Sequence, residues 1–109
     1  MQTNLDTHSL VTAATERRMV KFFKALSDRT RVSILKLLDD KERTVSEIVS
    51  NFNLSQPTIS RHLAVLKEAE LVMDRRQGQN VFYSLNDDVL TDTMQEFLGR
   101  FESADAEKT

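Results

Sequence analysis

Cysteine is absent from the 109 residues of the chain, and the sequence contains only two glycines and one proline. Without cysteine the chain can form no disulfide framework, no thiolate metal site and no thiol-based redox or nucleophilic centre. So few glycine and proline residues leave little room for long loops or interdomain linkers. We therefore expect a single domain over residues 1–109, with flexible ends at residues 1–9 and 102–109.

Long apolar runs are also missing. No stretch approaches the ~20 consecutive apolar residues of a membrane-spanning helix, and the first ten residues do not have the pattern of a signal peptide. We therefore expect a cytoplasmic protein without membrane insertion. The composition, 39% hydrophobic and 29% charged, is typical of a folded soluble domain. A domain this short buries a modest core, so a second subunit would provide useful additional apolar burial.

Acidic residues are concentrated at the C-terminal end. Residues 1–85 hold 13 Lys and Arg against 10 Asp and Glu, a net charge of +3, whereas residues 86–109 hold 2 against 7, a net charge of -5. Nucleic-acid binding responds to local electric fields rather than to the total charge. The overall charge of -2 therefore does not exclude DNA as a partner.

Apolar residues at helical spacing predict a helix from about Leu10 to Leu26. Asp28 is a suitable N-cap for a second helix. Thr44 and Glu47 have the T-x-x-E form of a capping box, which predicts a third helix that continues through Phe52.

A fourth helix is predicted to begin at Ser55 and to end near Glu70, with Pro57 in the first turn, where its missing N–H costs no intrahelical hydrogen bond. At 100° per residue, an inward-facing Ile59 places Arg61 on the opposite face. Two short helices joined by a tight turn, the second with a polar outer face, are the pattern of a helix-turn-helix.

A β-hairpin is predicted next, because strand-like segments at residues 72–77 and 81–85 flank a Gly-Gln-Asn turn. Asn86 and the two aspartates after it then favour the start of a last helix. The predicted fold class is mainly α with a small β-hairpin, a winged helix-turn-helix in which the hairpin lies between the fourth and the fifth helix.

The outer face of the fourth helix carries short or hydrogen-bonding side chains that can approach base edges in a major groove. The hairpin adds a basic projecting tip that suits phosphates and a minor groove. For His62, packing is the alternative to a DNA contact. The predicted DNA-binding residues are Ser55, Gln56, Pro57, Thr58, Ser60, Arg61, His62, Arg75, Arg76, Gln77, Gln79, Asn80 and Tyr83.

The first and last helices carry more large apolar side chains than a small helical head requires, which favours a homodimer. The alternative is that both helices only cover the core of one protomer. The predicted dimer-interface residues are Met19, Phe22, Phe23, Leu90, Met94, Phe97, Leu98 and Phe101.

Residues 25–31, 55–67 and 78–85 resemble the ArsR/SmtB type of bacterial winged-helix repressor, and the resemblance extends over about residues 15–101. Arg29 stands where that family usually carries proline. The resemblance implies dimerisation through the first and last helices, binding to a palindromic double-stranded DNA operator, and repression of transcription initiation.

The metal-sensing residues of that family have no counterpart in this chain. Thr44 and Ser46 occupy the positions of the arsenic-binding cysteines, and the last helix contains no histidine. Asp92 and Glu96 lie four residues apart but are expected to be a solvated pair. We therefore expect neither a metal nor another cofactor. Residues 83–92 are also similar to a metal-independent autorepressor branch, which implies control by a sequestering partner protein.

Enzymatic motifs are lacking as well, since the sequence has no glycine-rich phosphate loop and no Ser/His/Asp set that its spacing would bring together. We predict a homodimeric, sequence-specific repressor rather than an enzyme. The alternatives are an activator, a small-molecule-responsive regulator, and a protein-interaction module that uses the same scaffold without binding DNA.

Overall fold

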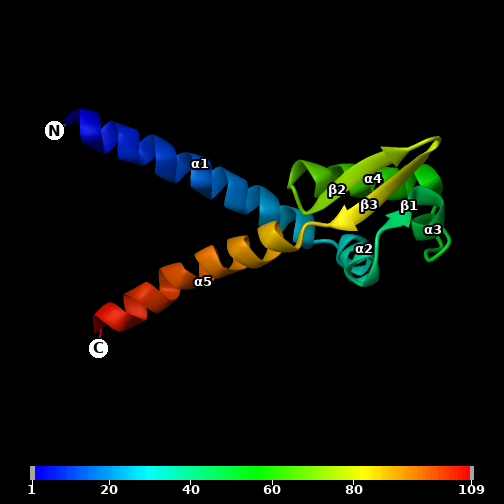
Figure 1. Ribbon diagram of the computed structural model, residues 1–109. Coiled ribbons are helices and arrows are strands. Elements are labelled where there is room, and N and C mark those ends of the chain that lie inside the picture. The colour runs from blue at the N-terminus through cyan, green and yellow to red at the C-terminus, as the bar shows by residue number, and fades with distance from the viewer. Residues whose placement is uncertain (1, 109) are drawn as a thin grey trace.

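A computed structural model describes the backbone of residues 2–108 and the side chains of residues 12–101. The elements are α1 (Gln2–Leu26), α2 (Arg29–Asp40), β1 (Arg43–Thr44), α3 (Val45–Val49), α4 (Gln56–Glu68), β2 (Val72–Gln77), β3 (Asn80–Leu85) and α5 (Asp87–Lys108). Helices α2 to α4 and the sheet form a head, and α1 and α5 project from the same side of it (Figure 1). The ends predicted to be flexible lie outside the residues described with side chains.

Hydrogen bonds confirm the predicted starts of α2, α3 and α4, whereas α1 begins at Gln2 and not near Leu10. The Arg31 backbone N–H donates to Asp28 Oδ2 at 3.1 Å, which caps α2. At α3 the Glu47 N–H donates to Thr44 Oγ1 (3.2 Å) and the Thr44 N–H donates to Glu47 Oε1 (2.8 Å), forming the capping box. Ser55 caps α4. These caps satisfy N–H groups that have no partner inside the helix.

Helix α3 is shorter than predicted, because it ends at Val49 and not at Phe52. Beyond Val49 the N–H groups of Asn51 and Phe52 donate to carbonyls three residues earlier, as in a tight turn. The Asn51 side chain also donates to the Glu47 carbonyl at 2.8 Å. Side-chain bonds of this kind compete with the helical hydrogen-bond pattern and end the helix.

The hairpin of β2 and β3 is confirmed, and the described strands form an antiparallel sheet in the order β1-β3-β2. Gly78 opens the hairpin turn with a φ of 63°, a conformation that glycine adopts at little cost. Strand β1 was not predicted, because two residues are too few to show an alternating pattern.

The core lies where α1, α2, α3 and α4 meet the base of the hairpin. The predicted inward face of α4 is confirmed, since Ile59 and Leu66 are 0% exposed and Leu63 is 1% exposed. The largest fully buried side chains are Phe22, Ile34, Ile48, Ile59, Leu63, Leu66 and Leu71. This packing fixes α4 against the other helices and leaves its opposite face in solvent.

Two of the predicted dimer-interface residues are buried within the protomer. Phe22 is 1% exposed within the core cluster, and Met19 is 6% exposed. Both side chains have almost no exposed surface in the protomer, so they offer little area to a partner subunit, and their place at a dimer interface stays a prediction.

Candidate nucleic-acid interface

The N-terminal half of α4 presents a polar surface on a rigid support. Gln56, Ser60 and Arg61 are exposed, whereas the helix is held from behind by its buried apolar face. The hydroxyls of Ser55 and Thr58 lie 2.9 Å apart and stabilise the first turn. A helix end with these side chains has the shape and the hydrogen-bonding groups that enter a major groove.

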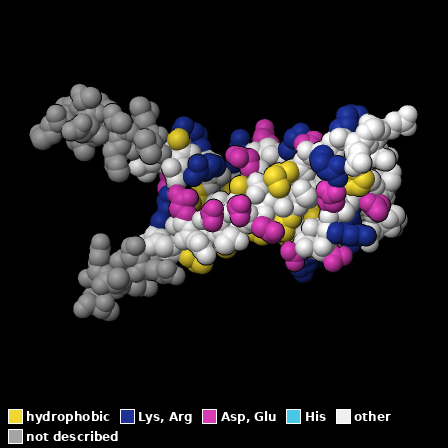
Figure 2. All heavy atoms as spheres, viewed as in Figure 1, with side chains coloured by type: hydrophobic (Ala, Val, Ile, Leu, Met, Phe, Trp, Pro, Cys, Tyr) yellow, Lys and Arg dark blue, Asp and Glu magenta, His cyan; other side chains and the backbone are white. Residues whose placement is uncertain are grey.

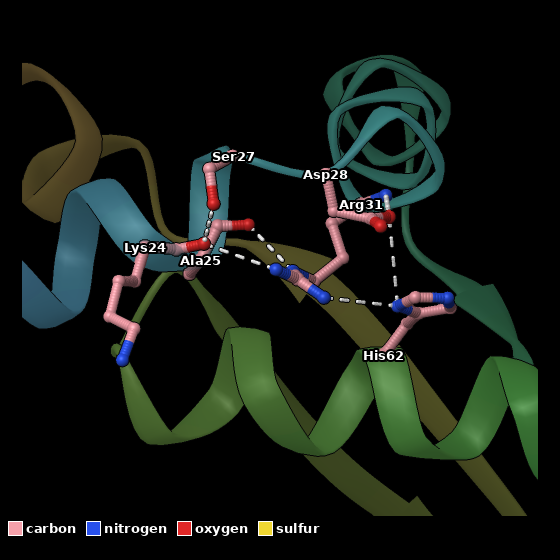
Figure 3. A network of polar contacts seen from close by, with 6 residues as sticks. All are labelled: Lys24, Ala25, Ser27, Asp28, Arg31 and His62. Atoms are coloured by element: carbon pink, nitrogen blue, oxygen red, sulfur yellow. Dashed lines mark hydrogen bonds and ion pairs between the residues drawn. The ribbon is translucent and has the colours of Figure 1, made fainter.

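His62 belongs to a polar network that joins α4 to the ends of α1 and α2 (Figure 3). Its Nδ1 lies 3.3 Å from Arg31 Nη1 and 3.8 Å from Asp28 Oδ2, and its side chain is 19% exposed. The Arg31 guanidinium also donates to the carbonyls of Ala25 (2.7 Å) and Lys24 (3.1 Å), which lie in the last turn of α1. This geometry favours the packing alternative for His62.

Arg31 is a residue whose importance sequence reasoning missed. It lies 31 positions before His62, and no local pattern connects the two residues. Its position was the available signal, because Arg31 follows the α2 N-cap by one turn. An arginine there is long and carries several donors, so it can reach a neighbouring helix. Arg31 fixes the angle between α1 and the helix that carries the exposed polar face.

The carboxylate of Asp28 has a pKa below its ordinary value of 3.8, chiefly because the Arg31 backbone N–H donates to it. The nearby positive charge of Arg31 and the interaction with His62 act in the same direction. A lowered pKa means that ionised Asp28 stabilises the fold above pH 3.8. That contribution is lost as the pH falls through the lower pKa of the folded state.

We expect Asp28→Ala to reduce the free energy of unfolding by ~1 kcal/mol at neutral pH, because α2 loses its N-cap. The difference between wild type and variant should shrink as the pH falls below 3.8, since Asp28 then becomes protonated. Urea denaturation at pH 7 and in acid measures both quantities at one protein concentration. Asp28→Asn is the control, because it caps the helix without titrating. A difference for Asp28→Ala that persists unchanged in acid would contradict this account.

The basic residues of the hairpin have different surroundings. Arg75 Nη2 lies 2.5 Å from Glu42 Oε1, and the Arg75 guanidinium lies 4.8 Å from the centre of the Phe82 ring. Arg75 Nη1 also donates to Gln77 Oε1 at 2.8 Å. Arg76 is exposed, and its side chain has no hydrogen-bond or ion-pair partner within the described part of the chain. The Arg76 side chain is therefore more available to an external partner than that of Arg75.

The tip of the hairpin consists of exposed polar residues, Gln77, Gln79 and Asn80. Tyr83, one of the predicted DNA-binding residues of the hairpin, does not lie at this tip. It pairs with Asp74 on one side and Arg43 on the other, and it packs against the core. The register of the sheet places it in the middle of β3, away from the turn.

The hairpin is tied to α4 by an ion pair. Lys67 Nζ on α4 lies 2.9 Å from Asp74 Oδ2 on β2. The hydrogen bond to Asp74, together with the negative charge of that carboxylate, raises the pKa of Lys67 above its ordinary value. The ion pair helps to keep the hairpin at a fixed position relative to the exposed face of α4.

Helices α1 and α5 meet through aromatic rings and charges. The rings of Phe23 and Phe97 have centroids 4.7 Å apart, and those of Phe97 and Phe101 are 5.1 Å apart. Arg18 pairs with Glu96 at 3.6 Å, and Arg100 pairs with Glu16. Figure 2 shows acidic side chains along the described part of α5, and side chains of both charges over the head.

The remaining predicted dimer-interface residues differ in how much surface they offer. Leu90 and Met94 are half-buried against the protomer core, and Phe23 and Phe97 are also half-buried. Leu98 is 48% exposed and Phe101 is 57% exposed. The apolar surface that these residues leave open therefore lies on the outer part of α5.

No group of three or more His, Asp or Glu side chains among the described residues is placed to hold a metal ion. Glu96 pairs with Arg18, and Asp92 is exposed. The described helices also include none with the length and apolar character needed to cross a membrane.

A tight turn between α3 and α4, an exposed polar face at the start of α4 and an adjacent β-hairpin define a winged helix-turn-helix DNA-binding protein. The sequence profile of the "Bacterial regulatory protein, arsR family" matches residues 28–74. The chain is 45% identical over 87 residues to the transcriptional repressor SdpR of Bacillus subtilis, which covers 80% of this chain and 97% of SdpR. The chain belongs to the ArsR family and is a DNA-binding transcriptional regulator, not an enzyme.

Solved structures are similar over most of the chain. The homodimeric winged helix-turn-helix DNA-binding domain of a Mycobacterium bovis protein superposes with a TM-score of 0.70 at 29% identity, over 87% of this chain and 89% of that domain. HlyU of Vibrio cholerae superposes with a TM-score of 0.64 at 37% identity, over 79% of this chain and 92% of HlyU. These similarities confirm the predicted fold class and helix order.

Proposed function

We propose that this regulator is a homodimeric repressor that binds a palindromic operator. The observation that carries the proposal is the exposed polar start of α4 on a helix whose other face is fully buried. Two comparisons support this proposal. The relative SdpR is a transcriptional repressor, and the Mycobacterium bovis domain is homodimeric.

In this proposal Gln56, Ser60 and Arg61 read base edges, because they are exposed at the start of α4. Arg61 can donate two hydrogen bonds to guanine, and Gln56 can pair with adenine. Arg76 and the polar tip of the hairpin hold the DNA backbone. Ser55, Pro57 and Thr58 shape the first turn and approach the phosphates.

Dimerisation sets the spacing of the two half-sites. A two-fold dimer presents two α4 helices to successive major grooves when they are roughly 34–36 Å apart, which is one turn of DNA. Such an arrangement requires an inverted repeat, since each α4 helix reads the same sequence on opposite strands. The exposed apolar surface of α5 is the proposed contact between the protomers.

We expect Arg76→Ala to weaken binding to operator and random DNA by the same factor and to reduce the salt dependence by about one phosphate contact. The Arg76 guanidinium is exposed and has no partner within the described part of the chain, so its charge is available to DNA. Fluorescence anisotropy at several salt concentrations measures both effects. Arg75→Ala is the matched variant, and its effect should be smaller because Glu42 already partners Arg75. A loss confined to the operator would contradict the assignment of Arg76 to the backbone.

The proposed function is tested by selecting bound duplexes from a random DNA library with the purified full-length protein. Enrichment of an inverted repeat with half-sites one turn apart would support the dimer and the operator together. A reporter gene placed behind the selected sequence then distinguishes repression from activation. If nothing is enriched and binding is weak and steeply salt-dependent, the free protein does not read sequence, and a ligand or partner protein would be required.

A further inference from the structure

A groove of about 540 Å³ lies between α1 and α4, outside the surface assigned to DNA. Its lining is strongly basic, with Arg17, Lys21, Lys24 and Arg31 against one carboxylate, Glu68. Four cations around one hollow attract an anion, and most of their charge is not neutralised by the residues that line the groove.

The same groove has an apolar component. Val20 is 57% exposed and Val65 is 40% exposed, and both line it. These two residues are among the large hydrophobic side chains that the described protomer leaves exposed. Phosphate groups gain nothing from such side chains, whereas an alkyl chain gains from burying them.

We propose that this groove binds a small anionic amphiphile, a carboxylate that carries an alkyl chain of medium length. The carboxylate would pair with the lysine and arginine side chains, and the alkyl chain would cover Val20 and Val65. The volume lies within the ~300–1,000 Å³ range of small-molecule pockets. One class of ligand therefore matches both the basic residues and the apolar residues of the groove.

The groove is separate from the base-reading residues. Val65 follows Gln56 by nine positions, which is ~14 Å along an α-helix. The groove contacts the C-terminal half of α4, and the exposed polar face lies at the N-terminal end. A ligand in the groove would not need to occupy the DNA surface.

The groove is nevertheless connected to that surface through Arg31. Arg31 lines the groove, and its guanidinium donates to carbonyls in the last turn of α1 and contacts His62 on α4. Figure 3 shows the Lys24 ammonium extending away from this network. A carboxylate bound by Arg31 and Lys24 would compete for the bonds that fix α1 against α4. This regulatory part rests on the proposed function, because it requires that α4 reads DNA.

The binding part is tested by calorimetric titration of octanoate into the full-length protein without DNA. We expect octanoate to bind, and octan-1-ol and acetate to bind at least about tenfold more weakly, because one lacks the charge and the other lacks the chain. Equal binding of octanoate and octan-1-ol, or no binding of octanoate, would overturn the proposal. The result does not depend on DNA binding, so its failure is distinguishable from failure of the proposed function.

Variants locate the site. Lys21→Glu combined with Lys24→Glu should weaken octanoate about tenfold or more, and so should Val65→Ser. Lys36→Glu is the matched control, because Lys36 is exposed on α2 outside the groove. Equal weakening by Lys36→Glu would overturn the proposal. The proposal would also be overturned if the wild type does not bind octanoate and Val65→Ser changes the oligomeric state. In that case a second copy of the chain covers the groove.

The effect on DNA is measured separately. Octanoate should change the affinity of the wild type for its selected operator, and it should leave the affinity of the Lys21→Glu, Lys24→Glu variant unchanged. If the charge reversals instead lower the salt dependence of DNA binding in the absence of octanoate, the groove contacts phosphate, and the proposal is overturned.

Discussion

Replacing both Leu98 and Phe101 with glutamate is expected to convert the dimer into a monomer and to weaken operator binding by about 10²- to 10⁴-fold. The two side chains are 48% and 57% exposed in the protomer, so the fold tolerates polar residues at these positions. At the proposed interface, however, buried carboxylates would be unpaired and would repel the acidic residues already present on α5. The affinity falls because two linked half-site contacts become independent.

Light scattering gives the oligomeric mass, and anisotropy with the selected operator gives the affinity. Circular dichroism should show unchanged helix content, which separates loss of the dimer from loss of the fold. Met73→Glu is the control, because Met73 is 49% exposed but lies on β2. A dimer that survives the double substitution would contradict the assignment of the outer part of α5 to the interface.

Arg61→Ala is expected to cost ~1–3 kcal/mol in operator binding and to relax the base preference at one position of each half-site. Arg61 is exposed on the face of α4 opposite the buried Ile59, so its guanidinium is free to enter the major groove of DNA. The loss should appear with operator DNA and should be much smaller with random DNA. Repeating the selection with the variant measures the base preference directly.

Arg61→Lys is the informative control for this experiment. Lysine keeps the positive charge but lacks the planar pair of donors that matches guanine O6 and N7. We expect Arg61→Lys to resemble Arg61→Ala in base preference while retaining most of the nonspecific affinity. Equal losses on operator and random DNA for Arg61→Ala would show that Arg61 contacts phosphate rather than a base.

The helix starts and the buried face of α4 could be predicted because they depend on short-range chemistry. Asp28, Thr44 and Ser55 cap helices through bonds to residues three positions away. The end of α3 was harder to predict, because Asn51 lies in an apolar helical pattern but uses its side chain to end it. Tyr83 lies in the hairpin and has a side chain that can contact DNA. Only the register of β3 with its neighbours places it against the core.

The sequence by itself determined the winged helix-turn-helix, the polar start of α4 and the absence of thiol chemistry, because these follow from residue type and local spacing. Only the tertiary structure decided that Phe22 belongs to the core, that Arg31 ties His62 to the end of α1, and that the hollow between α1 and α4 is basic. These features join residues that are far apart along the chain. Such contacts arise when the helices pack, and no periodicity in the sequence encodes their partners.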